Sequence, residues 1–95
     1  MTRDDRYQAL YAKAAPEGAY LAEPADPPAC LGFMAFGWDT YNDCPEYLLK
    51  TADTFPDLEV KAVAAITDGY AINKAIDLDT GDEFDVEVLV RFHPR

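Results

Sequence analysis

The sequence has 95 residues, of which 49% are hydrophobic and 27% are charged, and its formal net charge is −10. A chain of this length and composition is expected to fold as one domain over residues 1–95 with a modest core of its own, and it is not disordered by composition. Its acidity repels nucleic acid and anionic membranes, which excludes direct nucleic-acid binding and favours a basic protein surface as the partner.

The negative charge is unevenly distributed along the chain. Residues 1–38 carry a net charge of −2, residues 39–87 carry −10 from thirteen acids and three lysines, and residues 88–95 carry +2. The run 77–88, DLDTGDEFDVEV, holds six of the acids and no base. Any charge-driven interaction is therefore expected to involve the second half of the chain.

The chain shows no segment that addresses it to a membrane. No stretch approaches the roughly 18 apolar residues of a membrane helix, and the N-terminus lacks the apolar core of a signal peptide. We therefore expect a cytoplasmic protein. Cys30 and Cys44 are too few for a disulfide scaffold and are expected to be reduced thiols.

The first third of the chain predicts a helix followed by an extended arm. In residues 4–16, Tyr7, Leu10, Tyr11 and Ala14 fall on one helical face. Residues 16–29 contain four prolines, which predicts a proline-rich connecting arm. We expect Tyr20 and Leu21 to hold this arm against the rest of the domain.

The middle of the chain predicts a strand and a second helix. Residues 30–38, CLGFMAFGW, are apolar at nearly every position, which indicates a central strand covered on both faces. Residues 39–43 break it, and Asp43 and Glu46 have the spacing of a capping box for a helix over 44–55. The buried stripe of this helix would comprise Leu48, Leu49, Ala52 and Phe55.

The last third predicts three strands. Residues 58–66, 70–78 and 83–92 each alternate between apolar and polar positions, with turn signals at 67–69 and 79–82. The predicted order is α-β-α-β-β-β. Because a strand–helix–strand unit usually makes a parallel pair, we expect an α+β fold of ferredoxin-like character, with a mixed four-stranded sheet and two helices on one side.

Metal sites and cofactors are not predicted. Residues 77–88 lack the third ligand, the glycine and the final glutamate of a calcium loop, so Asp79 and Gly81 are better explained as turn residues. Two cysteines and His93 are too few for a zinc site. A Cys44–His93 nucleophile pair has no local support, and no phosphate-binding glycine motif is present. Paired carboxylates could in principle do acid–base work, but with eighteen acids in 95 residues two are expected to lie close together by chance. We therefore expect a protein that is not an enzyme, and an enzyme is the least favoured alternative.

Residues 37–47, GWDTYNDCPEY, combine aromatic and acidic side chains at a connection between elements. Tryptophan and tyrosine often anchor protein interfaces. The structural alternative is that Trp38 closes the core and Asp43 caps a helix. Asp39 and Tyr41 have no evident structural duty. The candidate partner-binding residues here are Trp38, Asp39, Tyr41, Asp43 and Glu46.

A second candidate surface is the acidic row of the last predicted strand. Glu83, Asp85 and Glu87 share one strand face, with Asp82 in the preceding turn. Neighbouring carboxylates repel, and only Arg91 and Lys74 could relieve them. The row is either a solvated, edge-protecting face or a line of charges that imitates phosphates.

In size, clustered acidity and compact α+β pattern, the chain resembles small acidic phage and mobile-element proteins that block bacterial defences, the anti-CRISPR and antirestriction inhibitors. The resemblance implies a DNA mimic that stoichiometrically occupies a basic nucleic-acid-binding surface of a CRISPR effector subunit or restriction enzyme. If the protein is phage-encoded, it would act in the cytoplasm of the bacterial host. An immunity protein or antitoxin, and a structural or assembly protein, remain open alternatives.

Overall fold

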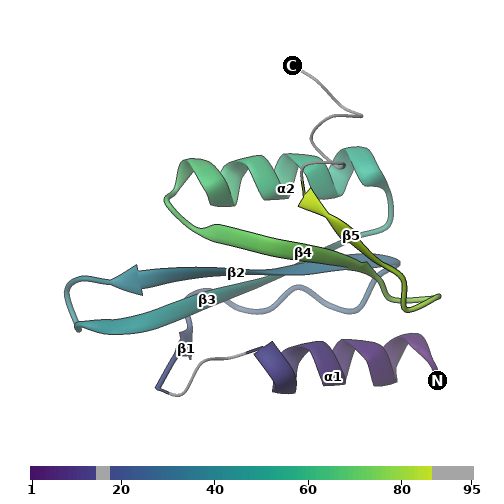
Figure 1. The fold of residues 1–95 in the computed structure, drawn as a ribbon, viewed down its shortest axis with the longest axis horizontal. Helices are drawn as coiled ribbons and strands as arrows, with labels where there is room; N and C mark the ends of the chain where they lie inside the picture. The colour runs from purple at the N-terminus through teal and green to yellow at the C-terminus, as the bar shows by residue number, and fades with distance from the viewer. Residues whose placement is uncertain (15–17, 87–95) are drawn as a thin grey trace.

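The computed structural model describes residues 1–14 and 18–86, and it places a mixed sheet between two helices (Figure 1). Within this part of the chain the sheet has five strands in the order β1-β3-β2-β4-β5. The elements follow the sequence as α1 (Arg3–Ala14), β1 (Tyr20–Leu21), β2 (Leu31–Asp39), β3 (Cys44–Ala52), α2 (Phe55–Thr67), β4 (Ala71–Asp77) and β5 (Glu83–Asp85).

The centre of the sheet is an antiparallel hairpin of β2 and β3, paired from Leu31 with Ala52 to Asp39 with Cys44. Both strands are apolar on both faces because each face is covered by a helix. Phe33 of β2 is fully buried against α2, whereas its neighbour Met34 is buried in the cluster on the α1 side. The predicted central strand over 30–38 is therefore confirmed, as is the predicted helix at the N-terminus.

The predicted helix over 44–55 is wrong, because these residues form β3. Tyr47, Leu48 and Leu49 are all buried in succession, which is the pattern of a strand covered on both faces. Such a continuous apolar run cannot be distinguished from a buried helix by periodicity alone. The capping-box spacing of Asp43 and Glu46 was coincidental, since Asp43 lies in the β2–β3 turn.

The predicted strand over 58–66 is also wrong, because these residues lie in α2. Thr54 caps the helix by accepting a hydrogen bond from the Asp57 backbone N–H at 3.3 Å, and Pro56 lies in the first turn, where no backbone donor is needed. Pro56 therefore starts this helix rather than ending the preceding element. Leu58, Ala62 and Ala65 form its buried face.

The exchange of these two elements changes the topology. β2 and β3 are antiparallel neighbours rather than a parallel pair joined by a helix, and the parallel pair in the sheet is β1 with β3. The helices cover opposite faces of the sheet instead of one side (Figure 1). The α+β class with two helices and a mixed sheet is confirmed, whereas the four-stranded, ferredoxin-like arrangement is only roughly matched.

The described part of the proline-rich arm lies along the outer edge of β3. After the short β1, the Ala22 N–H donates to the Tyr47 carbonyl at 2.9 Å and the Asp26 N–H donates to the Leu49 carbonyl at 3.1 Å. The Asp26 carboxylate accepts from Lys61 Nζ of α2 at 2.7 Å. Burial raises the pKa of Asp26, but Lys61 and the Thr51 backbone N–H outweigh burial and lower it. The arm thus protects a strand edge that would otherwise be exposed.

The last two strands of the described chain are antiparallel, as expected. β4 confirms the predicted strand over 70–78, and β5 matches the beginning of the predicted strand over 83–92. The rest of that prediction, including Glu87 and Arg91, lies outside the described residues, as does His93. No helix in the part of the chain that the structure describes is long and apolar enough to cross a membrane.

Candidate protein-binding site

The turn between β2 and β3 is built by Asp39. Its Oδ1 accepts the backbone N–H groups of Tyr41 at 2.9 Å and Asn42 at 3.1 Å, and its Oδ2 accepts Asn42 Nδ2 at 2.8 Å. The prediction that Asp39 lacks a structural duty is therefore wrong, since it closes an Asx-type turn. Asp43 caps no helix. It completes the turn from β2 to β3 in a left-handed backbone conformation, with a φ of 54°. We call residues 38–46 the hairpin tip.

Two aromatic side chains project from the hairpin tip. Tyr41 is 94% exposed and Trp38 is 56% exposed. The alternative that Trp38 closes the core is wrong. Because the tip extends beyond the layers formed by the helices (Figure 1), these rings are accessible to another molecule.

Two tyrosine hydroxyls hold the carboxylates of the tip. Tyr20 Oη, from β1, donates to Asp39 Oδ2 and lies 3.0 Å from Glu46 Oε2. Tyr70 Oη donates to Glu46 Oε1 at 3.0 Å. The Tyr20 hydroxyl, together with the donors of Asn42, lowers the pKa of Asp39 to about 2. Burial and the Glu46 carboxylate raise the pKa of Tyr70 to about 12. At neutral pH the Asp39 carboxyl group is therefore ionised and the Tyr70 hydroxyl group is protonated.

Sequence reasoning did not identify Tyr20 and Tyr70 as part of this site. Tyr20 was expected only to anchor the arm, and Tyr70 was an ordinary strand position. No local pattern could have found them, because Tyr20 lies 26 positions and Tyr70 24 positions from Glu46. Only the parallel pairing of β1 with β3 brings Tyr20 opposite Glu46.

The hairpin tip contains no internal counterion among the described residues. The four salt bridges in this part of the chain are Arg3–Asp79, Lys50–Glu23, Lys61–Asp26 and Lys74–Glu83. None of them involves Asp39, Asp43 or Glu46. The negative charge of the tip is therefore balanced by hydroxyl and amide dipoles and is available to an external cation.

The second acidic region, residues 77–85, is organised differently; we call it the acidic turn. Asp77 Oδ1 accepts the backbone N–H groups of Asp79 at 2.9 Å and Thr80 at 3.1 Å, and Gly81 has a φ of 86°. This geometry confirms the explanation of Asp79 and Gly81 as turn residues. No three His, Cys, Asp or Glu side chains within residues 1–14 and 18–86 are grouped so that they could hold a metal ion.

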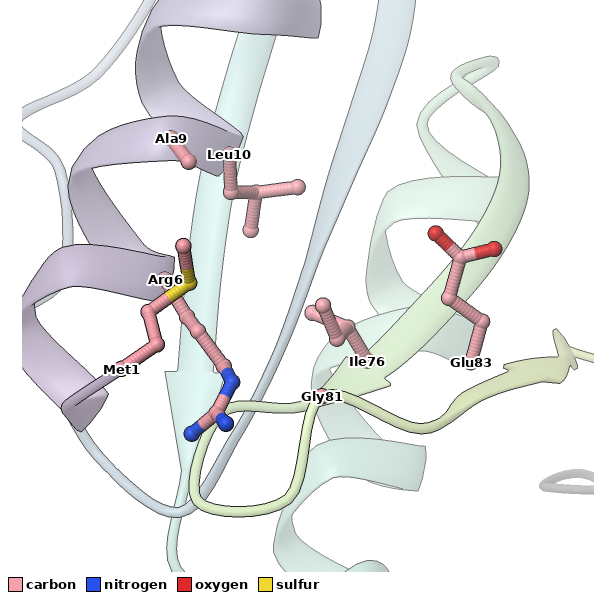
Figure 2. Close-up of a pocket in the computed structure, with 7 residues that line it drawn as sticks. All are labelled: Met1, Arg6, Ala9, Leu10, Ile76, Gly81 and Glu83. Atoms are coloured by element: carbon pink, nitrogen blue, oxygen red, sulfur yellow. The ribbon is translucent and has the colours of Figure 1, made fainter.

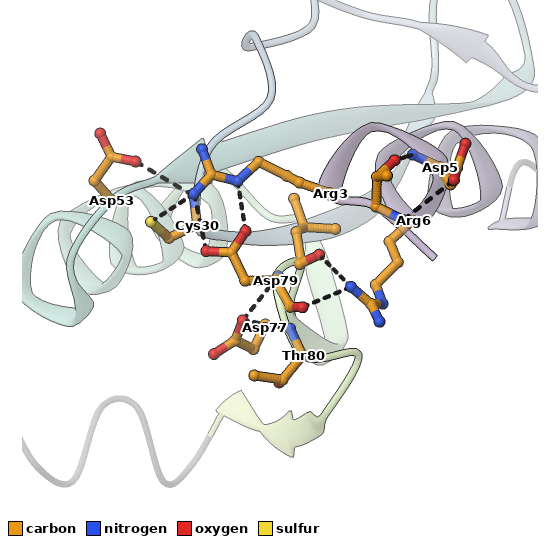
Figure 3. A network of polar contacts seen from close by, with 10 residues as sticks. Arg3, Asp5, Arg6, Cys30, Asp53, Asp77, Asp79 and Thr80 are labelled. Atoms are coloured by element: carbon orange, nitrogen blue, oxygen red, sulfur yellow. Dashed lines mark hydrogen bonds and ion pairs between the residues drawn. The ribbon is translucent and has the colours of Figure 1, made fainter.

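Two arginines of α1 bind the acidic turn (Figure 3). Arg3 pairs with Asp79 through Nε to Oδ1 at 2.7 Å and Nη2 to Oδ2 at 2.8 Å. Arg6 Nη1 donates to the carbonyls of Leu78 at 3.1 Å and Asp79 at 2.6 Å. The Arg3 guanidinium lowers the pKa of Asp79. The carboxylate of Asp79 is thus paired within the chain, whereas the contacts of Arg6 are with backbone carbonyls.

The acidic row on β5 is partly relieved as well. Glu83 and Asp85 are exposed on the same strand face, and Asp82 is exposed in the turn. Lys74 of β4 lies opposite Asp85 and approaches Glu83 at 3.9 Å, so Lys74 relieves the row as the sequence suggested. Glu87, the last member of the predicted row, lies outside the described residues.

The predicted site residues therefore form two separate groups. The hairpin tip lies at one end of β2, and the acidic turn adjoins the other end, where Leu31 pairs with Asp77. A nine-residue strand spans roughly 26 Å at about 3.3 Å per residue. The structure thus brings Trp38, Asp39, Tyr41, Asp43 and Glu46 together but separates them from Asp82, Glu83 and Asp85.

An open pocket of about 280 Å³ lies between α1 and the acidic turn (Figure 2). Its walls are largely apolar, including Leu10 and Ile76, with Arg6 and Glu83 as its charged groups. Arg6 is already bound to backbone carbonyls. Glu83 is thus the carboxylate of this lining.

The two cysteines lie at opposite ends of the hairpin. Cys30 precedes β2, whereas Cys44 begins β3 opposite Asp39. This separation far exceeds the roughly 7 Å between Cα atoms that a disulfide tolerates. Burial raises the pKa of both thiols, with nearby carboxylates adding to the effect, so neither has the character of an activated nucleophile. His93, the proposed partner of Cys44, lies outside the described residues.

Comparison of the chain with protein-family models, curated proteins and solved structures gave no match.

Proposed function

We propose that this protein is a stoichiometric, non-catalytic inhibitor that occupies a basic nucleic-acid-binding surface of a host defence effector, as anti-CRISPR and antirestriction proteins do. The observation that carries the proposal is the hairpin tip. Trp38 and Tyr41 are 56% and 94% exposed there, beside three carboxylates that have no salt bridge within the described chain.

The physical basis is the combination of unpaired charge with aromatic surface. A surface that grips phosphates presents lysine and arginine, which are attracted to fixed carboxylates and stack on aromatic rings. Trp38 and Tyr41 would supply the apolar contact that slows dissociation, while the net charge of −10 would speed encounter. Tyr20 and Tyr70 would act as positioning residues by fixing Asp39 and Glu46 before the partner arrives.

The proposal is tested by retention from a bacterial lysate. Tagged protein is incubated with a nuclease-treated lysate and eluted with increasing salt. We expect a nucleic-acid-binding protein that elutes as salt rises, because salt screens exposed charges. Adding this protein at a one-to-one ratio should then abolish nucleic-acid binding by the purified partner.

A matched pair of variants separates the tip from the overall charge. Asp43→Asn with Glu46→Gln removes two charges from the tip, and Asp82→Asn with Asp85→Asn removes two from the acidic turn. We expect the first pair to weaken partner binding by at least about tenfold and the second by less than about threefold. Equal losses would show that only net charge matters. Retention of the partner by the tip variant at wild-type strength would overturn the proposal.

A further inference from the structure

α2 has an outward surface that is unusual for an exposed helix. Opposite its buried face lies a stripe at helical spacing that carries no charge; we call this the outer stripe of α2, comprising Pro56, Val60, Val63, Ala64 and Thr67. Val60 is 58% exposed, and Ala64 and Thr67 are exposed as well. A surface helix normally carries charged residues at such positions.

The charged residues of α2 all lie away from this stripe. Glu59 is buried, and Lys61 is held by Asp26 of the arm at 2.7 Å. Asp57, in the first turn, and Asp68, at the C-cap, remain exposed. They are eleven positions apart (68 − 57), which places both on one flank of the outer stripe about three turns, or about 16 Å, from each other.

The C-terminal end of α2 is also without a compensating cation. The last turn of the helix contains no basic residue, and Asp68 caps it instead. Helix C-termini carry partial negative charge, which a nearby lysine or arginine stabilises. A carboxylate at this position adds to that charge, so the end of the stripe attracts a base from outside.

We infer that the outer stripe of α2 is a docking surface for a basic amphipathic helix. The partner's apolar face would cover Val60, Val63 and Ala64, while bases about three turns apart would meet Asp57 and Asp68. Positions eleven apart on a helix share a face, so one partner helix can present both bases. This surface belongs to a different element from the hairpin tip, and the inference does not depend on the proposed function.

Charge argues against a second copy of this chain as the occupant. Two copies packed through the outer stripe would each bring a net charge of −10. In an antiparallel arrangement Asp57 of one copy would approach Asp68 of the other, and in a parallel arrangement each would approach its equivalent. Like charges at an interface cost affinity, whereas a basic helix turns the same carboxylates into favourable contacts.

The test uses two designed 18-residue amphipathic peptides with the same leucine face. One carries lysines on its polar face, including a pair eleven positions apart, and the other carries glutamates at the same positions. Binding to the full chain is measured by titration calorimetry. We expect the lysine peptide to bind and the glutamate peptide not to bind.

The decisive variant is Val60→Glu, because it separates docking from non-specific charge attraction. An added carboxylate strengthens general attraction for a basic peptide, but it places a charge inside the apolar contact. We expect binding of the lysine peptide to fall by at least about tenfold, while circular dichroism and thermal unfolding remain close to wild type because Val60 is exposed. Asp57→Asn with Asp68→Asn should weaken binding by about two- to fivefold.

Three outcomes would overturn the inference. One is failure of the lysine peptide to bind. Another is unchanged or tighter binding by the Val60→Glu variant, which would identify charge attraction alone. The third is a dimer in analytical ultracentrifugation that Val60→Glu abolishes, which would make the stripe an interface between copies. The Asp4→Asn with Asp5→Asn variant serves as the control, because it removes two exposed charges from α1, on the opposite face of the sheet, and it should bind the lysine peptide like wild type.

Discussion

The hairpin tip and the acidic turn are both rich in carboxylates, but they differ in what neutralises them. In the acidic turn, Arg3 pairs with Asp79 through two hydrogen bonds, and Lys74 approaches Glu83. In the tip, tyrosine hydroxyls donate to Asp39 and Glu46, the Asn42 side-chain amide donates to Asp39, and no salt bridge within the described residues involves either carboxylate. The number of acids in a segment therefore does not measure its attraction for a cation, because the chain's own bases can already occupy them.

The largest expected effect comes from removing the aromatic side chains of the tip. Replacing Trp38 and Tyr41 together by alanine should weaken partner binding by about a hundredfold, since such side chains often dominate interface energy. The free energy of unfolding should change by no more than about 0.5 kcal/mol for exposed positions. Calorimetry and urea unfolding measure the two quantities. Phe55→Ala, an exposed aromatic on α2, is the control and should leave partner affinity unchanged.

The next largest effect is expected from Gly81→Ala, which disturbs the backbone of the acidic turn. Gly81 has a φ of 86°, and a Cβ there would lie 3.0 Å from Arg6 Nε, which the carbonyl hydrogen bonds hold in place. Gly69 has a φ of 93° but open space around it, so Gly69→Ala measures backbone strain alone. We expect losses of unfolding free energy of about 1 kcal/mol for Gly69→Ala and about 2 kcal/mol for Gly81→Ala. Equal losses would show that Arg6 simply moves aside.

Arg3→Gln sharpens the comparison by removing the counterion of the acidic turn. The loss of stability should be small, since both partners of the salt bridge are more than a third exposed to solvent and are screened by it. The protein becomes more negative, and Asp79 becomes available to a partner. If the tip is the binding site, partner affinity should change by less than about twofold. A severalfold gain would instead assign the partner to the acidic turn.

Asp39 should give the tip a recognisable pH dependence. Its pKa is lowered to about 2 in the folded protein by Tyr20 and Asn42, whereas an unfolded aspartate titrates near about 3.9. The unfolded state therefore binds more protons between these values, and the stability contributed by Asp39 is lost as the pH falls from about 4 to about 2. Urea unfolding across this pH range should show that the free energy of unfolding falls less steeply with decreasing pH in Asp39→Asn than in the wild type. Asparagine keeps an Oδ1 atom that can accept the hydrogen bonds of the turn. An unchanged slope would contradict the assignment.

The smallest effect concerns the backbone of the tip. Asp43 has a φ of 54°, a conformation that glycine adopts without cost. Asp43→Gly should raise the free energy of unfolding by up to about 0.5 kcal/mol, while Asp43→Ala should lower it. Thermal unfolding of both variants tests this. Stabilisation by alanine would show that the turn is not strained.

Local chemistry was sufficient to predict several elements. The stripe of Tyr7 and Leu10 predicted α1, the unbroken apolar run predicted β2, and the turn residues around Gly81 separated β4 from β5. The errors occurred where the local pattern fitted a helix as well as a strand. β3 is buried on both faces, so its continuous apolar run was interpreted as a helix. In α2, the exposed Val60 produces an apolar–polar alternation with its neighbours, so this helix was interpreted as a strand.

The candidate site was predicted in the same partial way. Aromatic and acidic residues cluster within 38–46 in the sequence. They are also close together in the structure, because a β-hairpin pairs residues that are near one another in the sequence. The structure did not join them to Asp82, Glu83 and Asp85, since a full strand length separates the two ends of the sheet. Periodicity carries no information on which end of a sheet a turn will occupy.

The sequence by itself determined the net charge, the proline-rich arm and the clustering of aromatic with acidic residues, because these depend on composition and on near neighbours. Tertiary structure decided that Trp38 and Tyr41 are exposed. It also decided which carboxylates are neutralised. Arg3 meets Asp79 across 76 positions and Tyr20 meets Glu46 across 26. Such pairings depend on strand order and on which face a helix covers, since ion pairs and hydrogen bonds form between groups that are close in space, whatever their separation along the chain.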